Sequence, residues 1–218
     1  MEPRFSGDVF VAYRQIYVES SSGFGCGLHA AFAGQNTGLC GAAEPGFLYL
    51  ATGLHTGRGG FTVELHDTEP ALDDSWEEAV EVSFRPASSR TDLTEWAGTA
   101  AYPLDLAETD YRVRYCATGM QAGHDLDTSP DDESVVDRYL LQFWPGPPGP
   151  DVLLKQTSTT AAHRHDFARG LPPAPAPAER EREQPRAEGL MRMPGGLSST
   201  ERPSSSMPGA NAAGPDRP

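Results

Sequence analysis

Carboxylates dominate one short segment of this sequence. Eight of them fall between Glu64 and Glu81, within the stretch FTVELHDTEPALDDSWEEAVEV, and this interval holds no Lys or Arg. Carboxylates without interleaved cations can bind a basic surface by charge complementarity. Tryptophan is enriched among the residues that contribute most to protein–protein binding. The candidate partner-binding residues are therefore Asp67, Glu69, Asp73, Asp74, Trp76, Glu77 and Glu78. The competing interpretations are a solvated loop for the carboxylates and ordinary packing for Trp76.

Two strands are expected to position these side chains. Apolar residues alternate with other residues on both sides of the acidic turn, at Phe61, Val63, Leu65, Val80, Val82 and Phe84. Alternation of this kind is typical of strands that bury one face. Residues 61–66 and 78–85 are therefore predicted to form a hairpin with one buried face and one strongly negative face.

The other strand candidates are short and rich in β-branched and aromatic residues. They cover residues 9–18, 47–54, 93–97, 101–104, 111–116 and 139–144. A long Gly-rich connection over 20–45 holds one short helix near 28–33, and a further short helix after Pro150 would be marginal alone. Seven or so strands separated by Gly, Pro and Asp turns predict an all-β, β-sandwich-like single domain.

The acidic domain is expected over residues 5–166, followed by a disordered Pro/Gly/Arg-rich tail over 168–218. After Phe167 the sequence has no aromatic residue, Val or Ile, and 16 of its last 51 residues are Pro or Gly. Such a segment buries too little apolar area to offset its conformational entropy. The remaining length of about 165 residues is sufficient for one two-layer core.

The charge balance limits the classes of partner. Residues 1–167 contain 25 Asp and Glu against 10 Lys and Arg, and the whole chain has a net charge of −14. Nucleic acids and anionic membranes are bound largely through Lys and Arg, so neither is an expected partner. The amino terminus lacks a basic region followed by an apolar one, and the uncharged segment 20–43 is too polar to span a membrane. We therefore expect a cytoplasmic protein with a basic protein as its partner.

Four stretches of the sequence resemble the competence-J (Nin) family of DNA-entry-nuclease inhibitors. They are VFVAYRQIYVE, GGFTVELHD, DDSWEEAVEVSFRP and YPLDLAETDYRVRYC, in that order along residues 9–117. The Gly-rich segment 20–45, the loop 124–133 and the tail depart from the family pattern. The resemblance implies a β fold, the absence of catalysis and a protein target.

Two segments have some features of metal sites. His163 and His165 would share one face of a strand, with Asp166 beside them, and could then bind one metal ion. No further ligand is evident, so a solvent-exposed basic end is the favoured interpretation. The segment HDLDTS from His124 imitates the start of a calcium loop, but Pro and Val stand where such loops need Gly and Glu. No metal ion or cofactor is therefore expected.

The three cysteines are Cys26, Cys40 and Cys116. Cys26 and Cys40 could form a disulfide under oxidising conditions, but the odd count and the lack of a CxxC spacing favour buried or half-buried thiols. Cys26 and His29 could meet on a helix as nucleophile and base. Nothing in the sequence supplies an oxyanion hole or an orienting acid for them.

Three functional hypotheses follow from these features. The first is a non-enzymatic acidic binding protein, an inhibitor or immunity-type partner of a basic protein such as a nuclease. The second is a small-molecule or sensor module that uses the Gly-rich loop and the uncharged strand 47–54 as a pocket wall. The third and least favoured is a hydrolase built on Cys26 or the histidines.

Overall fold

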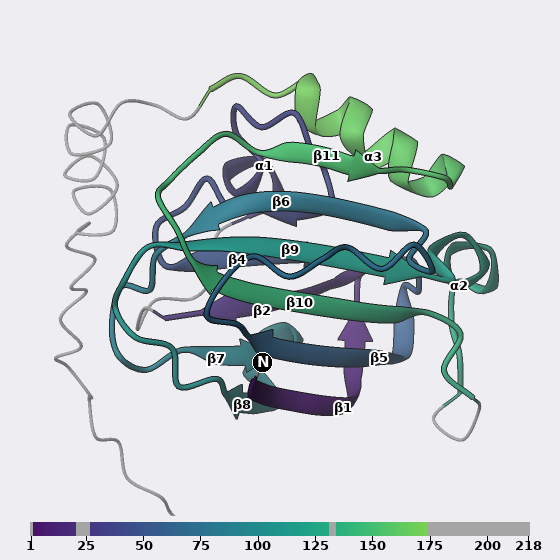
Figure 1. The fold of residues 1–218 in the computed structure, drawn as a ribbon. Coiled ribbons are helices and arrows are strands. Elements are labelled where there is room, and N and C mark those ends of the chain that lie inside the picture. Colours follow the sequence, from purple (N-terminus) through teal and green to yellow (C-terminus); the bar gives the residue numbers. More distant parts are fainter. Residues whose placement is uncertain (1, 21–26, 131–133, 174–218) are drawn as a thin grey trace, which may run out of the picture. The chain divides into compact units, whose positions relative to one another are not determined.

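The computed structural model describes residues 2–20, 27–130 and 134–173. The chain divides into two compact units, Met1–Ala174 and Pro175–Pro218, and the second lies outside the described residues. The expected disordered tail falls almost entirely in that second unit and stays a prediction. All further description concerns the first unit, whose ribbon is drawn in Figure 1.

Eleven strands form one connected sheet in the described residues. They are β1 (Glu2–Ala12), β2 (Gln15–Glu19), β3 (Cys40–Gly41), β4 (Phe47–Ala51), β5 (Thr56–Leu65), β6 (Glu78–Phe84), β7 (Asp92–Thr94), β8 (Ala101–Pro103), β9 (Tyr111–Thr118), β10 (Arg138–Pro145) and β11 (Val152–Lys155). Their order is β11-β6-β9-β10-β5-β1-β2-β4-β3, with β7 attached to β2 and β8 to β7. Only β10 and β5 run parallel among these strand pairs.

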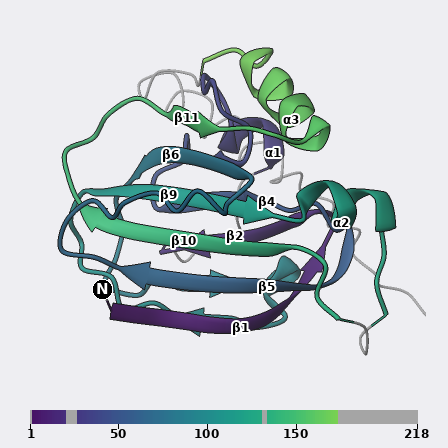
Figure 2. The ribbon, with the colours of Figure 1, turned by 45° about the vertical axis from the view of Figure 1, so that its right-hand side comes forward.

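The sheet folds back on itself at the junction of β1 and β2. β1 pairs with β5 along its whole length but meets β2 only at Ala12 and Gln15, so the two strands diverge from their shared turn. β2 and β4 consequently lie behind β9 and β10 in Figures 1 and 2. The core between the two layers contains Val11, Val18, Leu50, Val82, Tyr115 and Leu141. The predicted all-β, sandwich-like domain is therefore confirmed.

The first expected strand, 9–18, consists of two strands. A two-residue turn at Tyr13 and Arg14 separates them, with φ angles of 57° and 61°. Turns of this kind usually contain Asn-Gly, because few side chains tolerate positive φ. The sequence VAYRQI has no such signal, and its β-branched and aromatic residues read as one continuous strand.

The predicted hairpin between 61–66 and 78–85 is wrong. β5 pairs with β1 and β10, whereas β6 pairs with β9 and β11, so two strands lie between β5 and β6. The connection is long enough to pass over them, and residues 66–77 run across the outer face of β10 and β9 (Figures 1 and 2). We call residues 66–77 the acidic strap.

The described residues also contain four short helical segments: α1 (Leu28–Ala31), the 3₁₀ helix η1 (Trp96–Gly98), α2 (Met120–Leu126) and α3 (Thr159–Arg169). α1 confirms the helix expected near 28–33. The helix expected directly after Pro150 is instead strand β11, and α3 begins later, where the Ser158 side chain accepts a hydrogen bond from the Ala161 amide at 3.1 Å. α3 continues three residues past the expected domain end at 166. Within the described ranges, none of the helices is long and apolar enough to cross a membrane.

Candidate functional site

Arg114 holds the centre of the acidic strap against the sheet. This residue of β9 has a side chain that is only 3% exposed. Its guanidinium donates to Glu81 Oε1 on β6, at 2.7 and 3.0 Å. It also donates to the strap, to Glu69 Oε1 at 3.1 Å and to the Pro70 carbonyl at 2.6 Å. One buried cation therefore connects the strap to the strands beneath it.

Polar and aromatic side chains of β9 and β10 form the face of the sheet beneath the acidic strap. The guanidinium carbon of Arg114 lies 5.3 Å from the centre of the Trp144 ring, and Trp144 is buried. Gln142, on the same strand, is also buried, and its amide donates to Glu64 Oε2 at 2.9 Å. The strap thus contacts Arg114, which in turn lies over the Trp144 ring.

Backbone hydrogen bonds fix both ends of the acidic strap. At its start the His66 amide donates to the Phe143 carbonyl at 2.8 Å. At its end the Glu77 amide donates to the Ala117 carbonyl at 3.1 Å, and Glu77 Oε2 accepts from the Gly119 amide at 2.8 Å. The strap is therefore attached to β10 at one end and to the end of β9 at the other.

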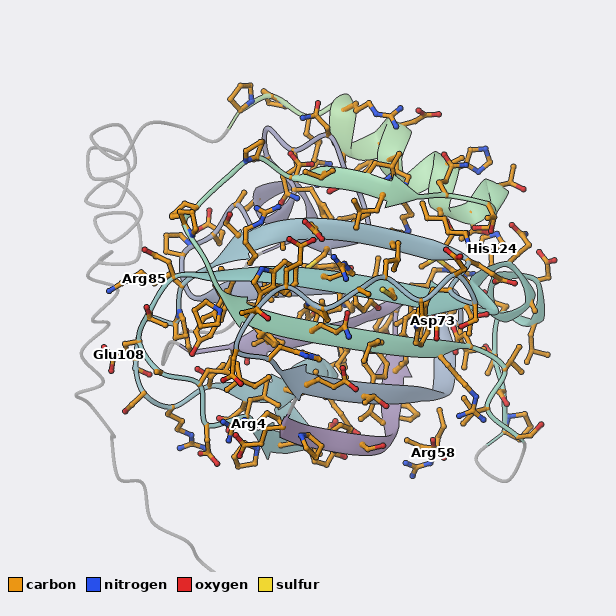
Figure 3. The ribbon with its side chains drawn as sticks, viewed as in Figure 1. Arg4, Arg58, Asp73, Arg85, Glu108 and His124 are labelled. Atoms are coloured by element: carbon orange, nitrogen blue, oxygen red, sulfur yellow. The ribbon has the colours of Figure 1, made fainter. Side chains whose placement is uncertain are left out.

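The acidic strap directs most of the candidate carboxylates toward solvent. The exposed members are Asp67, Glu69, Asp73, Asp74 and Glu77. Trp76 is half-buried. Figure 3 places Asp73 over the face of the sheet, while Arg4, Arg58 and Arg85 lie toward its periphery. The five exposed carboxylates thus all belong to one segment that runs over the outer face of the sheet (Figure 1).

The turn in the middle of the acidic strap is ordered by its own side chains. Asp73 Oδ1 accepts from the Ser75 amide at 2.8 Å, and the Trp76 amide donates to the Asp73 carbonyl at 3.3 Å. The hydrogen bond from the Ser75 amide lowers the pKa of Asp73, so this carboxylate stays ionised. Lys155 donates to the Asp74 carbonyl at 2.8 Å, which ties the turn to β11.

Glu78 does not share this surface. It is 0% exposed. Its carboxylate accepts from the Ser158 amide at 2.7 Å and from the Thr157 amide and hydroxyl at 3.1 Å each. These donors lie at the start of α3, where the helix dipole also favours a negative charge. Its position shows a structural role in α3 and removes Glu78 from the exposed set, because a buried and fully paired carboxylate cannot contact a partner.

The two histidines of the possible metal site lie on a helix and not on a strand. His163 and His165 both lie on α3, where residues two apart point in different directions. His163 is exposed, whereas His165 is buried and its Nδ1 accepts from the Gly38 amide at 2.9 Å. Burial lowers the pKa of His165 to about 4. No group of three or more metal-ligating side chains occurs in the part of the chain that the structure describes.

The segment from His124 begins inside α2 and not at the start of a loop. Asp125 accepts from Gln121 at 2.9 Å, and Asp127 pairs with Arg14 at 2.6 Å. These carboxylates therefore have protein partners. The rest of the loop, residues 131–133, lies outside the described residues.

The thiols that the structure describes are buried and inert. Cys40 and Cys116 form no disulfide. Burial raises the pKa of both thiols, that of Cys116 to about 12, which disfavours the reactive thiolate. Cys26 lies outside the described residues, so its possible disulfide with Cys40 and its possible contact with His29 are not tested. His29 itself packs edge-on against Phe167.

The strand expected to line a ligand pocket is part of the core. All five residues of β4 are buried. An open cavity of about 310 Å³ lies instead between residues 42–46 and 83–87, with Glu108 on its rim. It adjoins the end of the Gly-rich connection but has no contribution from β4.

No protein-family model matches the chain, and a comparison with curated proteins gives no match. Two solved structures resemble it. ComJ from Bacillus subtilis, described as an inhibitor of the DNA-degrading activity of NucA, is 14% identical, with 66% of this chain and 98% of that chain covered and a TM-score of 0.47. The product of crocagin biosynthetic gene J is 18% identical, with 67% and 100% covered and a TM-score of 0.41. At these identities and TM-scores both likenesses are distant.

Sequence reasoning missed the residues that fix the acidic strap. Arg112 and Arg114 alternate with Tyr111, Val113 and Tyr115 in the sequence, and nothing in that alternation alone shows that Arg114 is buried. One signal was available in the sequence: this strand has two arginines, whereas the segment 64–81 has eight carboxylates and no Lys or Arg. That imbalance favours an ion pair between an arginine of the strand and a carboxylate of the segment.

Proposed function

We propose that this chain is a non-enzymatic, cytoplasmic binding protein whose acidic strap contacts a basic protein. The observation that carries the proposal is the fixed cluster of exposed carboxylates above a buried arginine. Asp67, Glu69, Asp73, Asp74 and Glu77 are all exposed, and the strap beneath them is bonded to the sheet at its centre and at both ends. A surface that is already ordered loses little conformational entropy on binding.

The charge of the acidic strap is only partly neutralised by its neighbours. The segment itself contains no Lys or Arg. Arg114 beneath it pairs with Glu69 of the strap but also with Glu81, and Lys155 beside it donates to a backbone carbonyl. The surface therefore retains a negative field, which increases the association rate with a basic partner and favours its selection over neutral ones.

A nuclease is the kind of basic partner that we propose. Nucleases hold phosphates with cationic grooves, and a surface of carboxylates can occupy such a groove in place of the nucleic acid. The sequence resemblance to the competence-J family implies the same kind of target. In this proposal the chain inhibits by occlusion and performs no chemistry itself.

The test is a pull-down from an extract of the native cell at low salt, with the full chain as bait. The variant Asp67→Lys/Asp74→Lys reverses two exposed charges whose side chains make no hydrogen bond within the described residues. The control Asp8→Lys/Glu108→Lys makes the same change in net charge at exposed sites off the strap, and Figure 3 shows Glu108 far from Asp73.

We expect wild type and the control to retain the same basic protein and the strap variant to lose it. Each reversal replaces an attraction between a strap carboxylate and a cation of the partner by a repulsion. The two reversals together should weaken binding by about 1–3 kcal/mol, which is about 5-fold to 150-fold. Nuclease activity of the retained protein should fall when the wild-type chain is added. Equal retention by the strap variant and the control would refute the acidic strap as the binding surface.

A further inference from the structure

β11 forms a free edge of the sheet. It is the first strand in the sheet order and pairs with β6 alone, from Val152 opposite Glu81 to Lys155 opposite Ala79. Figures 1 and 2 show no strand beyond it, and none of the described residues pairs with its outer side. The backbone groups on that outer side are therefore open to pairing with another chain.

The side chains of this edge are unusually apolar. Val152, Leu153 and Leu154 are 38%, 39% and 40% exposed. The pairing register shifts between Leu153 and Lys155, so Leu154 has no partner residue on β6. Edge strands of natural proteins are commonly protected by charged residues, and here the single lysine turns toward the Asp74 carbonyl. Three consecutive apolar residues thus remain accessible.

The edge is held in position at both ends. Before the strand, Asp151 accepts from the Thr37 amide at 2.6 Å and from the Asn36 amide at 2.7 Å. At its end, Lys155 donates to Asp74 at 2.8 Å. An edge that is fixed before binding can act as a template for an added strand.

The contact between Lys155 and Asp74 makes the edge continuous with the acidic strap. A strand added beside β11 would carry its side chains next to the exposed carboxylates of Asp73 and Asp74. Charge complementarity therefore favours a segment with Lys or Arg. A second copy of this chain is disfavoured, because each copy has a net charge of −14 and would bring an identical acidic strap to the contact.

We propose that β11 binds an extended segment of the basic partner as an additional strand of the sheet. The inference rests on the proposed function, since the acidic strap selects the partner's charge. Main-chain hydrogen bonds to β11 then supply affinity, and the apolar side chains of Leu153 and its neighbours contact alternate side chains of the segment.

The probe is a fluorescein-labelled octapeptide of alternating valine and lysine, added to the full chain at low salt. Its twin carries a methyl group on every backbone nitrogen, so the twin keeps the charge but cannot donate hydrogen bonds. Binding is measured by fluorescence anisotropy. The variant Leu153→Thr/Leu154→Thr removes the apolar contact without changing the charge or the β propensity.

We expect the methylated twin to bind at least tenfold more weakly than the parent peptide, and the threonine variant to weaken parent binding severalfold. Hydrogen exchange of β11 amides should slow at least tenfold with the parent peptide only. Equal binding of both peptides, with unchanged exchange in β11, would overturn the inference.

The strap variant Asp67→Lys/Asp74→Lys separates this inference from the proposed function. If both peptides bind wild type equally and the strap variant binds neither, the acidic strap is supported as a binding surface and strand addition at β11 is refuted. If the strap variant and wild type bind the parent peptide equally and methylation abolishes binding, strand addition at β11 is supported and the proposed function is refuted. Absence of binding to either peptide refutes the edge. Self-association that the threonine variant abolishes would assign β11 to a second copy and refute it as well.

Discussion

Replacement of Arg114 by alanine is the most informative single change to the domain. It removes the cation that joins the acidic strap to β6 and leaves the Glu81 carboxylate beneath the strap. Arg112 remains near that carboxylate, 3.5 Å from its other oxygen, and can compensate in part. The Pro70 carbonyl loses its donor, and Trp144 loses the planar group that covers its ring.

The size of the effect follows from the burial of the Arg114–Glu81 pair. Breaking a buried ion pair by removing one partner costs about 3–5 kcal/mol, and we expect about 3 kcal/mol because Arg112 compensates in part. With a urea m-value of about 2 kcal/mol/M, the unfolding midpoint should fall by about 1.5 M. Arg114→Lys keeps the charge but loses the forked geometry, so its cost should be intermediate.

Urea unfolding of the full chain measures this prediction, with Arg90→Ala as the matched control. The Arg90 side chain is 84% exposed, and its loss should change the free energy of unfolding by less than about 0.5 kcal/mol. Hydrogen exchange should also show faster exchange of the Glu77 amide in Arg114→Ala. A loss below about 1 kcal/mol, or one no larger than that of the control, would refute Arg114 as the anchor of the acidic strap.

Three further changes test the packing around α3. Glu78→Gln removes a buried charge from the start of this helix and should lower the free energy of unfolding by about 2 kcal/mol in urea titration; no change would contradict its structural role. Because the folded pKa of His165 is about 4, below its unfolded value, its stability contribution is lost as pH falls from about 6.5 to 4. The difference in unfolding free energy between wild type and His165→Asn should therefore shrink by about 3 kcal/mol between pH 7 and pH 4, and a constant difference would refute a buried neutral imidazole. Gly38→Ala should destabilise by about 2 kcal/mol in thermal unfolding, because its Cβ would lie 1.9 Å from the Arg164 carbonyl oxygen; an unchanged Tm would contradict this close approach.

The strands were predictable where their apolar residues alternate, but their pairing was not. Residues 111–116 show the alternation clearly, and residues 139–144 are rich in aromatic and other apolar residues; β9 and β10 confirm both strands. The segments 61–66 and 78–85 show the alternation as well, yet they are separated by those two strands. The local alternation of apolar residues predicts which residues form strands, whereas the pairing partner of each strand depends on the packing of the whole domain.

The acidic cluster was predictable from the sequence, whereas the different roles of its members were not. Glu77 and Glu78 are adjacent and chemically alike, but the first is exposed and the second is buried against α3. The sequence could not separate them, because their difference depends on a helix eighty residues later. Arg114 was unpredictable as an anchor for the same reason, since its partners come from β6 and the acidic strap.

The affinity of the captured basic protein for the two charge-matched variants tests most directly whether the acidic strap is a binding surface. We predict that Asp67→Lys/Asp74→Lys binds about 5-fold to 150-fold more weakly than Asp8→Lys/Glu108→Lys at low salt, and that higher salt reduces the difference. Equal affinities of the two variants at low salt would contradict the account, because net charge and not the fixed carboxylates of the acidic strap would then govern binding.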